Sequence, residues 1–207
     1  GVKPESVTGA VMTPIFASST FAHSSPGNHK GYEYSRTQNP TRKALEESLA
    51  ELENGSKAFA FASGVAAQSA ILETLKPGDH VIAFDDLYGG TFRLFNEIKA
   101  KSANIEFTFT DLNKNFSKLI KKNTKMIWIE TPTNPLLKIT DLKRIARIAK
   151  KKKILTVCDN TFATPYNQRP LDFGIDVVNH STTKYINGHS DVILSLIHIS
   201  EPTRRAI

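Results

Sequence analysis

Residues 57–84 read KAFAFASGVAAQSAILETLKPGDHVIAF and contain three consecutive elements. The runs Lys57–Phe61 and His80–Phe84 are short, apolar and bounded by turn residues, as buried strands are. Between them, Ser63-Gly64 begins a helix that is closed by Pro77-Gly78. A strand, a helix and a second strand in immediate succession indicate an α/β architecture.

The same alternation continues on both sides of this unit. We expect a mainly parallel sheet flanked by helices, in which ligands bind beyond the carboxyl ends of the strands. The expected helices are residues 42–53, with Thr41 as the cap, and residues 91–101, 114–122 and 140–151; the other expected strands are residues 105–109, 126–129, 154–157 and 175–178. Residues 1–40 are rich in Gly, Pro, Ser and Thr without a sustained period, which predicts an extended arm.

Composition excludes several classes of protein. The 207 residues can bury one substantial core, and the hydrophobic and charged fractions, 40% and 23%, are ordinary for a soluble protein. A single cysteine, Cys158, excludes an internal disulfide framework and favours a cytoplasmic location. No apolar run is long enough to span a bilayer. We therefore expect no membrane partner and no metal site.

The net charge of +7 allows a nucleic-acid surface as an alternative. Much of the excess lies in residues 118–125 and 144–153, where lysines are not interleaved with aromatic residues as a single-strand binder requires. Solvated helix ends and loops explain these patches more simply, because cations are favoured in the last turn of a helix. We expect no nucleic-acid partner.

Lys184 lies in Ser181-Thr182-Thr183-Lys184-Tyr185, directly after the apolar run Ile175–Val178. A lysine amine held at the end of a rigid strand suits covalent attachment of pyridoxal 5'-phosphate (PLP). The hydroxyls of Thr183 and Ser181, one and three residues earlier, can face the phosphate of that cofactor. Lys184 is therefore the first candidate for a catalytic residue.

Three further positions suit the same cofactor, and each has a structural alternative. Ser63-Gly64-Val65 can bind a phosphate at a helix start, or it can be a plain turn. Asp159 follows a strand and can pair with a pyridine nitrogen, or it can cap a turn. Tyr88, before Gly89-Gly90, can stack on a ring, or it can be an ordinary loop residue.

Two more candidates lie in a proline-rich loop and in the arm. Asn134 stands between prolines and can offer a fixed amide to the cofactor's ring oxygen, or the loop can be a plain connection. Tyr34 and Arg36 point the same way in an extended segment, and arginine suits bidentate phosphate binding. The arm can serve its own subunit or a neighbouring one.

The stretch from Thr8 to Val192 resembles the Cys/Met-metabolism family of PLP enzymes. That family includes cystathionine γ-synthase, cystathionine lyases, methionine γ-lyase and O-acetylhomoserine sulfhydrylase. The segments that carry the likeness are Thr8–Val11, Pro14-Ile15, Tyr34–Arg36, Asn39–Thr41, Ser63-Gly64, Asp79–Thr91, Glu130–Pro135, Asp159–Thr161 and Ser181–Val192.

The resemblance implies a role for each candidate. Lys184 would bond to PLP and then shuttle protons, and Asp159 would pair with the ring nitrogen. Tyr88 would stack on the ring and act in proton transfer. The phosphate would be held by Ser63, Gly64, Val65, Ser181 and Thr183. Tyr34 and Arg36 would reach the phosphate of an adjacent subunit, which implies a homo-oligomer, a dimer of dimers, with a small amino acid as substrate.

The resemblance also implies a truncated chain. Residues 41–193 would form the large domain of fold type I (aspartate aminotransferase-like), and the C-terminal small domain would be absent. Residues 194–207 depart from the family pattern and look like translated adapter or cloning sequence, so we expect that they are not native and do not pack.

For the activity, the resemblance implies trans-sulfuration. Gly90 lies where methionine γ-lyases carry a cysteine, which argues against that activity. Cystathionine γ-lyase is favoured, with cystathionine γ-synthase and O-acetylhomoserine sulfhydrylase as alternatives. A fragment with a partial cofactor pocket and no activity is the alternative of another class.

Overall fold

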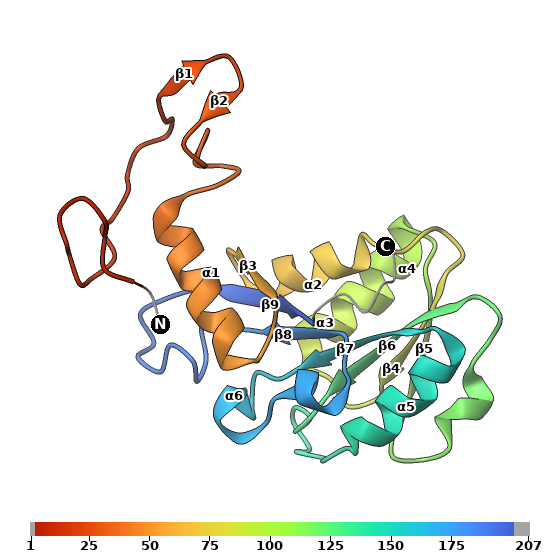
Figure 1. Ribbon diagram of the computed structural model, residues 1–207. Helices are drawn as coiled ribbons and strands as arrows, with labels where there is room; N and C mark the ends of the chain where they lie inside the picture. The colour runs from red at the N-terminus through yellow and green to blue at the C-terminus, as the bar shows by residue number, and fades with distance from the viewer. Residues whose placement is uncertain (1–2, 201–207) are drawn as a thin grey trace.

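The computed structural model describes residues 3–200, and its centre is a seven-stranded sheet (Figure 1). The strand order is β3-β9-β8-β7-β6-β4-β5. Strands β8, β7, β6, β4 and β5 are parallel, whereas β9 is antiparallel to both of its neighbours. The bounds are β3 Lys57–Phe61, β4 His80–Phe84, β5 Glu106–Thr110, β6 Thr124–Glu130, β7 Leu155–Asp159, β8 Val177–His180 and β9 Ser195–Ile199.

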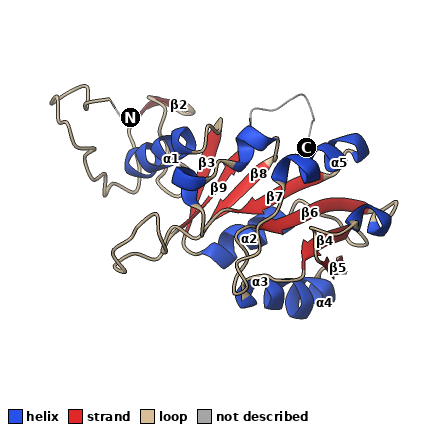
Figure 2. Cartoon of the chain, turned by 90° about the horizontal axis from the view of Figure 1, so that it is seen from below, coloured by secondary structure: helices blue, strands red, loops and turns tan. Residues whose placement is uncertain are grey.

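Helices cover both faces of the sheet, with α2, α3 and α4 on one side and α5 on the other (Figure 2). The helices are α1 Pro40–Leu52, α2 Gly64–Leu72, α3 Gly89–Arg93, α4 Ala100–Ser102, α5 Leu142–Lys152 and α6 Thr164–Asn167; a π-helical segment, Leu94–Lys99, joins α3 to α4, and Phe116–Leu119 and Pro170–Phe173 are 3-10 turns. The predicted α/β class is confirmed. Within residues 3–200, no helix combines the length and apolar character needed to cross a membrane.

Aromatic packing fixes one face of the sheet. Trp128 on β6 is fully buried, and the ring of Phe95 meets it edge-on with centroids 5.1 Å apart. Phe95 also stacks on Phe107 of β5 at 4.9 Å. Such aromatic pairs each add about 0.5–1.5 kcal/mol beyond the burial of their area. The helix over 89–102 is thereby anchored to β5 and β6.

A buried histidine joins three strands at the amino edge of the sheet. His80 begins β4, and its Nδ1 lies 2.7 Å from the hydroxyl of Thr124 on β6. Its Nε2 lies 2.8 Å from the hydroxyl of Thr108 on β5. Burial and the nearby Lys121 lower the pKa of His80, so the ring is neutral in the fold.

A cluster of hydrogen bonds joins the N-terminal arm to the start of α1. The cap of α1 is Asn39 and not Thr41 as predicted, because Pro40 occupies the first helical position and the Asn39 side chain accepts the N–H groups of Thr41 and Arg42. The Thr41 hydroxyl instead donates to Pro14 O at 3.0 Å and accepts from Phe16 N at 2.9 Å. Within the arm, the hairpin of β1 (His23–Ser25) and β2 (Asn28–His29) projects away from the sheet (Figure 1).

The prediction that residues 194–207 do not pack is wrong for Ser195–Ile199. These residues form β9 and pair with β3 and with β8. The physical reason is that SLIHI, buried on both faces, fills the gap between two strands that would otherwise leave their backbone groups unpaired. Residues 201–207 lie outside the described residues. The non-native origin of the segment stays a prediction.

One residue fits β9 poorly. The imidazole of His198 is fully buried, and neither ring nitrogen has a hydrogen-bond partner among the described residues. Burial and the neighbouring His180 lower the pKa of His198 to about 3. The ring is therefore neutral and unpaired in the sheet.

We expect His198→Val to raise the free energy of unfolding by about 1–3 kcal/mol at pH 7, because it removes an unsatisfied buried polar group and retains a β-branched side chain. Urea denaturation at fixed pH measures this change. Ser195→Ala is the matched control on the same strand, because the Ser195 hydroxyl does have a partner, His180 O, and its loss should destabilise. A destabilised His198→Val protein would contradict the expectation.

Candidate functional site

The predicted site residues gather where the parallel strands end. Ser63 follows β3, Tyr88 lies in the connection after β4, Asn134 lies in the loop after β6, Asp159 ends β7, and Ser181 follows β8. Because parallel strands share one carboxyl edge, the loops after them meet at this edge. The polar segments are far apart in sequence, and the sheet brings them into one neighbourhood.

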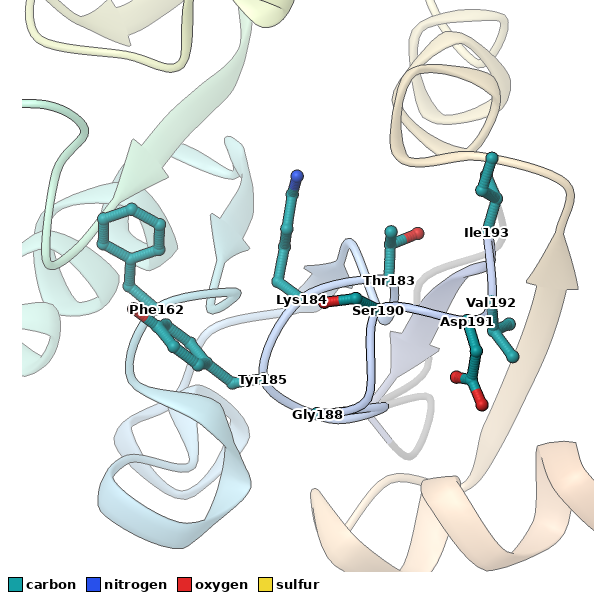
Figure 3. A pocket seen from close by; sticks show the side chains of 9 residues that line it. All are labelled: Phe162, Thr183, Lys184, Tyr185, Gly188, Ser190, Asp191, Val192 and Ile193. Carbon is teal, nitrogen blue, oxygen red and sulfur yellow. The ribbon is translucent and has the colours of Figure 1, made fainter.

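Lys184 lies in a cavity of about 660 Å³ at this edge. Phe162, Thr183 and Tyr185 line the cavity together with residues 188 and 190–193. Figure 3 shows the Lys184 side chain extending away from its own loop, between Phe162 and Ile193. The Phe162 and Tyr185 rings meet edge-on with centroids 6.0 Å apart. Lys184 is exposed, and the Phe162 and Tyr185 rings line the cavity with it.

The N-terminus of α2 faces the start of the lysine loop. Ser63 caps the helix through its hydroxyl, which accepts from Ala66 N at 3.2 Å. A Cβ on Gly64 would lie 3.3 Å from Ser181 Cβ, so the two segments touch and only glycine fits without displacement. Val65 is exposed in the first turn. Unpaired N–H groups and a nearby hydroxyl form an arrangement that can bind an anion.

Thr183 belongs to the cavity, but its hydroxyl already has partners. It donates to Leu194 O at 3.1 Å and accepts from Leu194 N at 3.0 Å. Its predicted contact with a phosphate is thus not prepared in this structure and stays a prediction.

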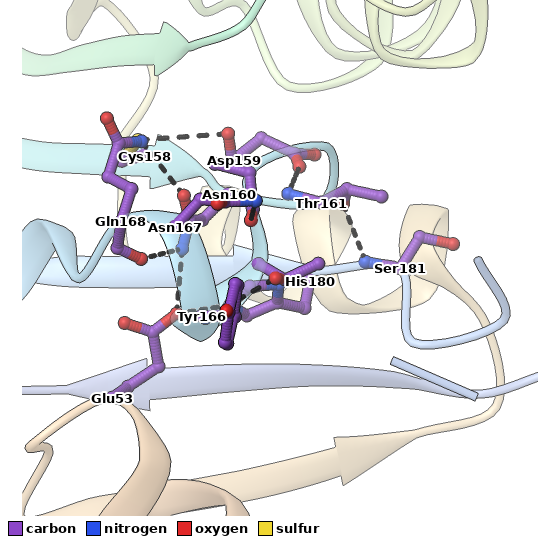
Figure 4. Close-up of polar contacts among 12 residues, drawn as sticks. Glu53, Cys158, Asp159, Asn160, Thr161, Tyr166, Asn167, Gln168, His180 and Ser181 are labelled. Carbon is purple, nitrogen blue, oxygen red and sulfur yellow. Dashed lines mark hydrogen bonds and ion pairs between the residues drawn. The ribbon is translucent and has the colours of Figure 1, made fainter. Parts of the chain in front are cut away.

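Asp159 ends β7, and neutral donors surround its carboxylate. Oδ1 accepts from Thr161 N at 3.0 Å. Oδ2 accepts from Asn179 Nδ2 at 2.9 Å and from Gln68 Nε2 at 3.4 Å. Thr161 also accepts, through its hydroxyl, from Ser181 N at 2.9 Å, which links the end of β7 to the lysine loop (Figure 4).

Glu130 and Tyr88 form a second part of the same cluster. Glu130 pairs in register with Asp159 across β6 and β7, and its Oε2 accepts from Tyr88 N at 3.0 Å. Burial raises the pKa of Glu130 to about 9, and the charges of Asp159 and Asp86 add to this effect. Glu130 is therefore a neutral acid that fixes the backbone at Tyr88.

The Tyr88 ring rests on a glycine. A Cβ at Gly90 would stand 2.4 Å from Tyr88 Cε1, closer than atoms approach. The ring is about half-exposed, at 47%, so it can present a face to a ligand. Gly90 thereby sets where this ring lies.

A second buried group of polar side chains surrounds Asn160. The Glu53 carboxylate accepts from Asn160 Nδ2 at 2.9 Å and contacts His180 Nε2 at 2.5 Å (Figure 4). Asn160 Nδ2 also donates to Gln168 O at 2.8 Å. These contacts hold the loop after β7 in place.

Of the predicted site residues, Thr183 and Lys184 line the cavity. The others at this edge of the sheet are not among its lining residues: Ser63, Gly64, Val65, Tyr88, Asp159 and Ser181. Tyr34, Arg36 and Asn134 are not among them either. Arg36 lies over the ring of Tyr34 at 4.8 Å, and both belong to the arm. Asn134 lies in the loop after β6, where its backbone N–H contacts Glu130. Their predicted cofactor contacts remain predictions.

Sequence reasoning assigned no site role to Gln68, Asn179 and Glu130. Each nevertheless stands out in the sequence. Gln68 is a polar residue in a mostly apolar helix, Asn179 lies in an apolar strand, and Glu130 ends a strand. A polar side chain in such a position needs a buried partner. The identity of that partner is a tertiary fact and could not be read from the sequence.

The comparisons with known proteins agree with this geometry. The family model described as Cys/Met metabolism PLP-dependent enzyme matches residues 1–206. A cystathionine β-lyase of Coxiella burnetii is 58% identical over 93% of this chain and 50% of its own length. A probable cystathionine γ-synthase of Herpetosiphon aurantiacus is 53% identical over 93% of this chain and 61% of its own length.

A solved structure, cystathionine γ-lyase from Lactobacillus plantarum complexed with L-serine, superposes with a TM-score of 0.94. It is 46% identical, and the match covers 98% of this chain and 53% of that one. The chain thus spans between half and two thirds of the length of these relatives, and the fold is that of the large domain of fold type I PLP enzymes. The chain belongs to the Cys/Met metabolism family of PLP-dependent enzymes.

Proposed function

We propose that this protein binds PLP through Lys184 and catalyses carbon–sulfur bond chemistry on a cystathionine-type amino acid. The observation that carries the proposal is the position of the loop that holds Lys184: its first residue, Ser181, touches Gly64 at the α2 N-terminus and bonds to Thr161, whose N–H donates to the Asp159 carboxylate. The whole protein's activity is part of the proposal, because this chain spans about half of its relatives.

The residues present fit PLP. The cradle of Gly64 and Ser181 suits the phosphate, because a Cβ would fill it. The Asp159 carboxylate suits the ring nitrogen, and the Tyr88 ring suits the ring face. When bound, the cofactor supplies a carbonyl group for amines and an electron sink for the substrate carbon.

The protein's own groups then supply positioning and proton transfer. The exposed Lys184 amine is the group that takes a proton from the substrate's α-carbon and returns it to a neighbouring carbon. Tyr88, which is half-exposed in the loop after β4 at the same edge of the sheet, assists the departure of the sulfur group. Neutral Glu130 holds the Tyr88 backbone without adding a second negative charge beside Asp159.

Among the family's reactions we favour γ-cleavage of cystathionine. Relatives at similar identity bear the names of β-lyase, γ-lyase and γ-synthase, which supports the family chemistry without choosing among them. Identifying the compounds that the full-length protein forms from cystathionine, or from cysteine and an activated homoserine, distinguishes these three activities. Cysteine, 2-oxobutanoate and ammonia indicate γ-cleavage, whereas homocysteine, pyruvate and ammonia indicate β-cleavage. Cystathionine made from cysteine and an activated homoserine indicates the synthase.

We also propose that the arm acts on a neighbouring subunit. The hairpin projects away from the sheet (Figure 1), and Tyr34 and Arg36 are not among the lining residues of the Lys184 cavity. Val11, Met12 and Ile15 on the arm are each at least 82% exposed. Such apolar exposure suits a surface that another copy covers.

We expect borohydride reduction in the presence of PLP to add the cofactor mass to the peptide containing Lys184, and Lys184→Ala to lose it completely. Peptide mass mapping and the visible absorption band are the readouts. Lys118→Ala, which removes another exposed lysine, is the matched control and should retain both signals.

Adduct formation at other lysines alone, or an unchanged band in Lys184→Ala, would refute the proposal. A labelled chain that does not turn over cystathionine, beside an active full-length product, would identify this chain as an inactive fragment with a partial pocket.

A further inference from the structure

Two buried amides converge on one carboxylate oxygen. Gln68 of α2 is 2% exposed and Asn179 of β8 is fully buried. Both donate to Oδ2 of Asp159, at 3.4 Å and 2.9 Å. Burying an amide is unfavourable unless its polar atoms find partners, so two such groups at one atom call for an explanation.

The orientation of the Gln68 amide is fixed. Its Oε1 accepts from the hydroxyl of Thr91 at 3.1 Å, and an ionised carboxylate offers no donor. The amide must therefore turn its NH₂ group to Asp159 and its oxygen to Thr91. Because Thr91 belongs to α3, which begins next to Tyr88, this chain of bonds joins the carboxylate to the helix that carries the Tyr88 loop.

Asn179 is held less completely. Its Oδ1 has no hydrogen-bond partner among the described residues although the side chain is buried. An apolar side chain at this strand position would avoid that unfavourable burial. A polar group that remains with one atom unsatisfied is typical of a functional constraint.

The donors around Asp159 are all neutral. Among residues 3–200, no Lys, Arg or His forms an ion pair with this carboxylate, and its described partners are amide and backbone donors. Oδ2 carries both amides. Oδ1 accepts one described hydrogen bond, from Thr161 N, and keeps an acceptor position for a further donor.

We propose that Gln68 and Asn179 are positioning residues that occupy Asp159 Oδ2, fix the orientation of the carboxylate and leave Oδ1 for the ring N–H of PLP. The inference rests on the proposed function. Gln68 adds a link to Thr91, so the position of Asp159 and that of the Tyr88 loop are set together.

The test uses Gln68→Met and Asn179→Leu, which keep side-chain size and remove the donors. We expect each to weaken PLP affinity about 10-fold, as loss of a hydrogen bond to a charged group does. We also expect each to displace the pH midpoint of the visible absorption band of bound PLP. Thr74→Val is the matched control, because its hydroxyl, just past the end of α2, bonds only to Ile71 O among the described contacts.

A second measurement separates action through Asp159 from a general effect on folding. In an Asp159→Ala background, Gln68→Met and Asn179→Leu should cause no further loss of affinity, because residues that act through a shared partner are not additive. Equal losses in both backgrounds would overturn the inference. Thermal unfolding of each variant reports whether it folds.

The outcomes distinguish the two proposals. A wild-type protein without PLP on Lys184 refutes the proposed function and the inference with it. A wild-type protein that binds PLP, together with variants of unchanged affinity and midpoint, refutes the inference alone. If Gln68→Met does not fold, Thr91→Val tests the same contact, because it removes the hydroxyl that holds the Gln68 amide oxygen. An unchanged pH midpoint of the absorption band in Thr91→Val would overturn the proposed link from Thr91 through Gln68 to Asp159.

Discussion

Glu130→Gln raises the free energy of unfolding at pH 7 by about 3 kcal/mol. The pKa of Glu130 is about 9 in the fold against 4.5 for the ordinary side chain, so the folded protein keeps a proton that the unfolded chain loses. The stability of the wild type therefore falls as pH rises from 4.5 toward 9. Glutamine is neutral throughout, and its oxygen can still accept the Tyr88 N–H bond.

Urea denaturation of both proteins at pH 5 and pH 8 measures this difference. The gain should be small at pH 5 and large at pH 8. Glu47→Gln is the control, because this carboxylate is 61% exposed and pairs only with Lys43 on the helix surface in the described contacts. Stability curves of wild type and Glu130→Gln that run parallel with pH would show that Glu130 is ionised in the fold.

Gly90→Ala moves the Tyr88 ring and lowers turnover by the full-length gene product on the order of 100-fold. The added Cβ would stand 2.4 Å from Tyr88 Cε1, and the half-exposed ring can swing away more easily than the backbone can shift. A displacement of about 1 Å in a positioned catalytic group is enough for a loss of this size. Folding stability should change little, because the ring is free to move.

Steady-state kinetics and PLP titration measure the effect. We expect a PLP affinity about 3- to 10-fold weaker, the range of an aromatic contact. Gly89→Ala is the matched control, since a Cβ there meets only the end of the Arg93 side chain, at 3.4 Å. Equal losses from the two substitutions would contradict a specific contact between residue 90 and the ring.

The sheet was largely predictable from the sequence, because its buried strands are continuous apolar runs. Lys57–Phe61 and His80–Phe84 match β3 and β4 to the residue, and the other predicted strands differ only at their ends. The helix expected over 114–122 is a single 3-10 turn, Phe116–Leu119, since its few apolar positions give it little to pack against.

Strand β9 could not be predicted, because the tail was interpreted from its departure from the family pattern. Its five residues are nevertheless sufficient to fill a strand position, and pairing with two neighbours outweighs the buried, unpaired His198. Backbone pairing on both sides and burial of its side chains place this segment in the sheet.

The site was predictable as a list of chemical groups but not as a set of contacts. Lys184, Gly64, Ser181 and Asp159 were expected at the carboxyl ends of strands in a mainly parallel sheet, so the sequence predicted that they lie at one edge. Helix capping, in contrast, depended on one residue: Pro40 at the first helical position made Asn39 the cap. The partners of Gln68 and Asn179 lie in other elements, and only the folded chain brings them together.

The neutral ring of His80 lies at the amino end of strand β4, and the neutral acid of Glu130 lies at the carboxyl end of strand β6 in the same sheet. Acid charges the first, whose pKa is lowered, and alkali charges the second, whose pKa is raised. Acidification should thus loosen the strands β4, β5 and β6 at their amino ends, whereas alkalinisation should loosen the ligand end first. Hydrogen exchange should therefore show faster exchange at the amino ends of these strands at low pH and at their carboxyl ends at high pH.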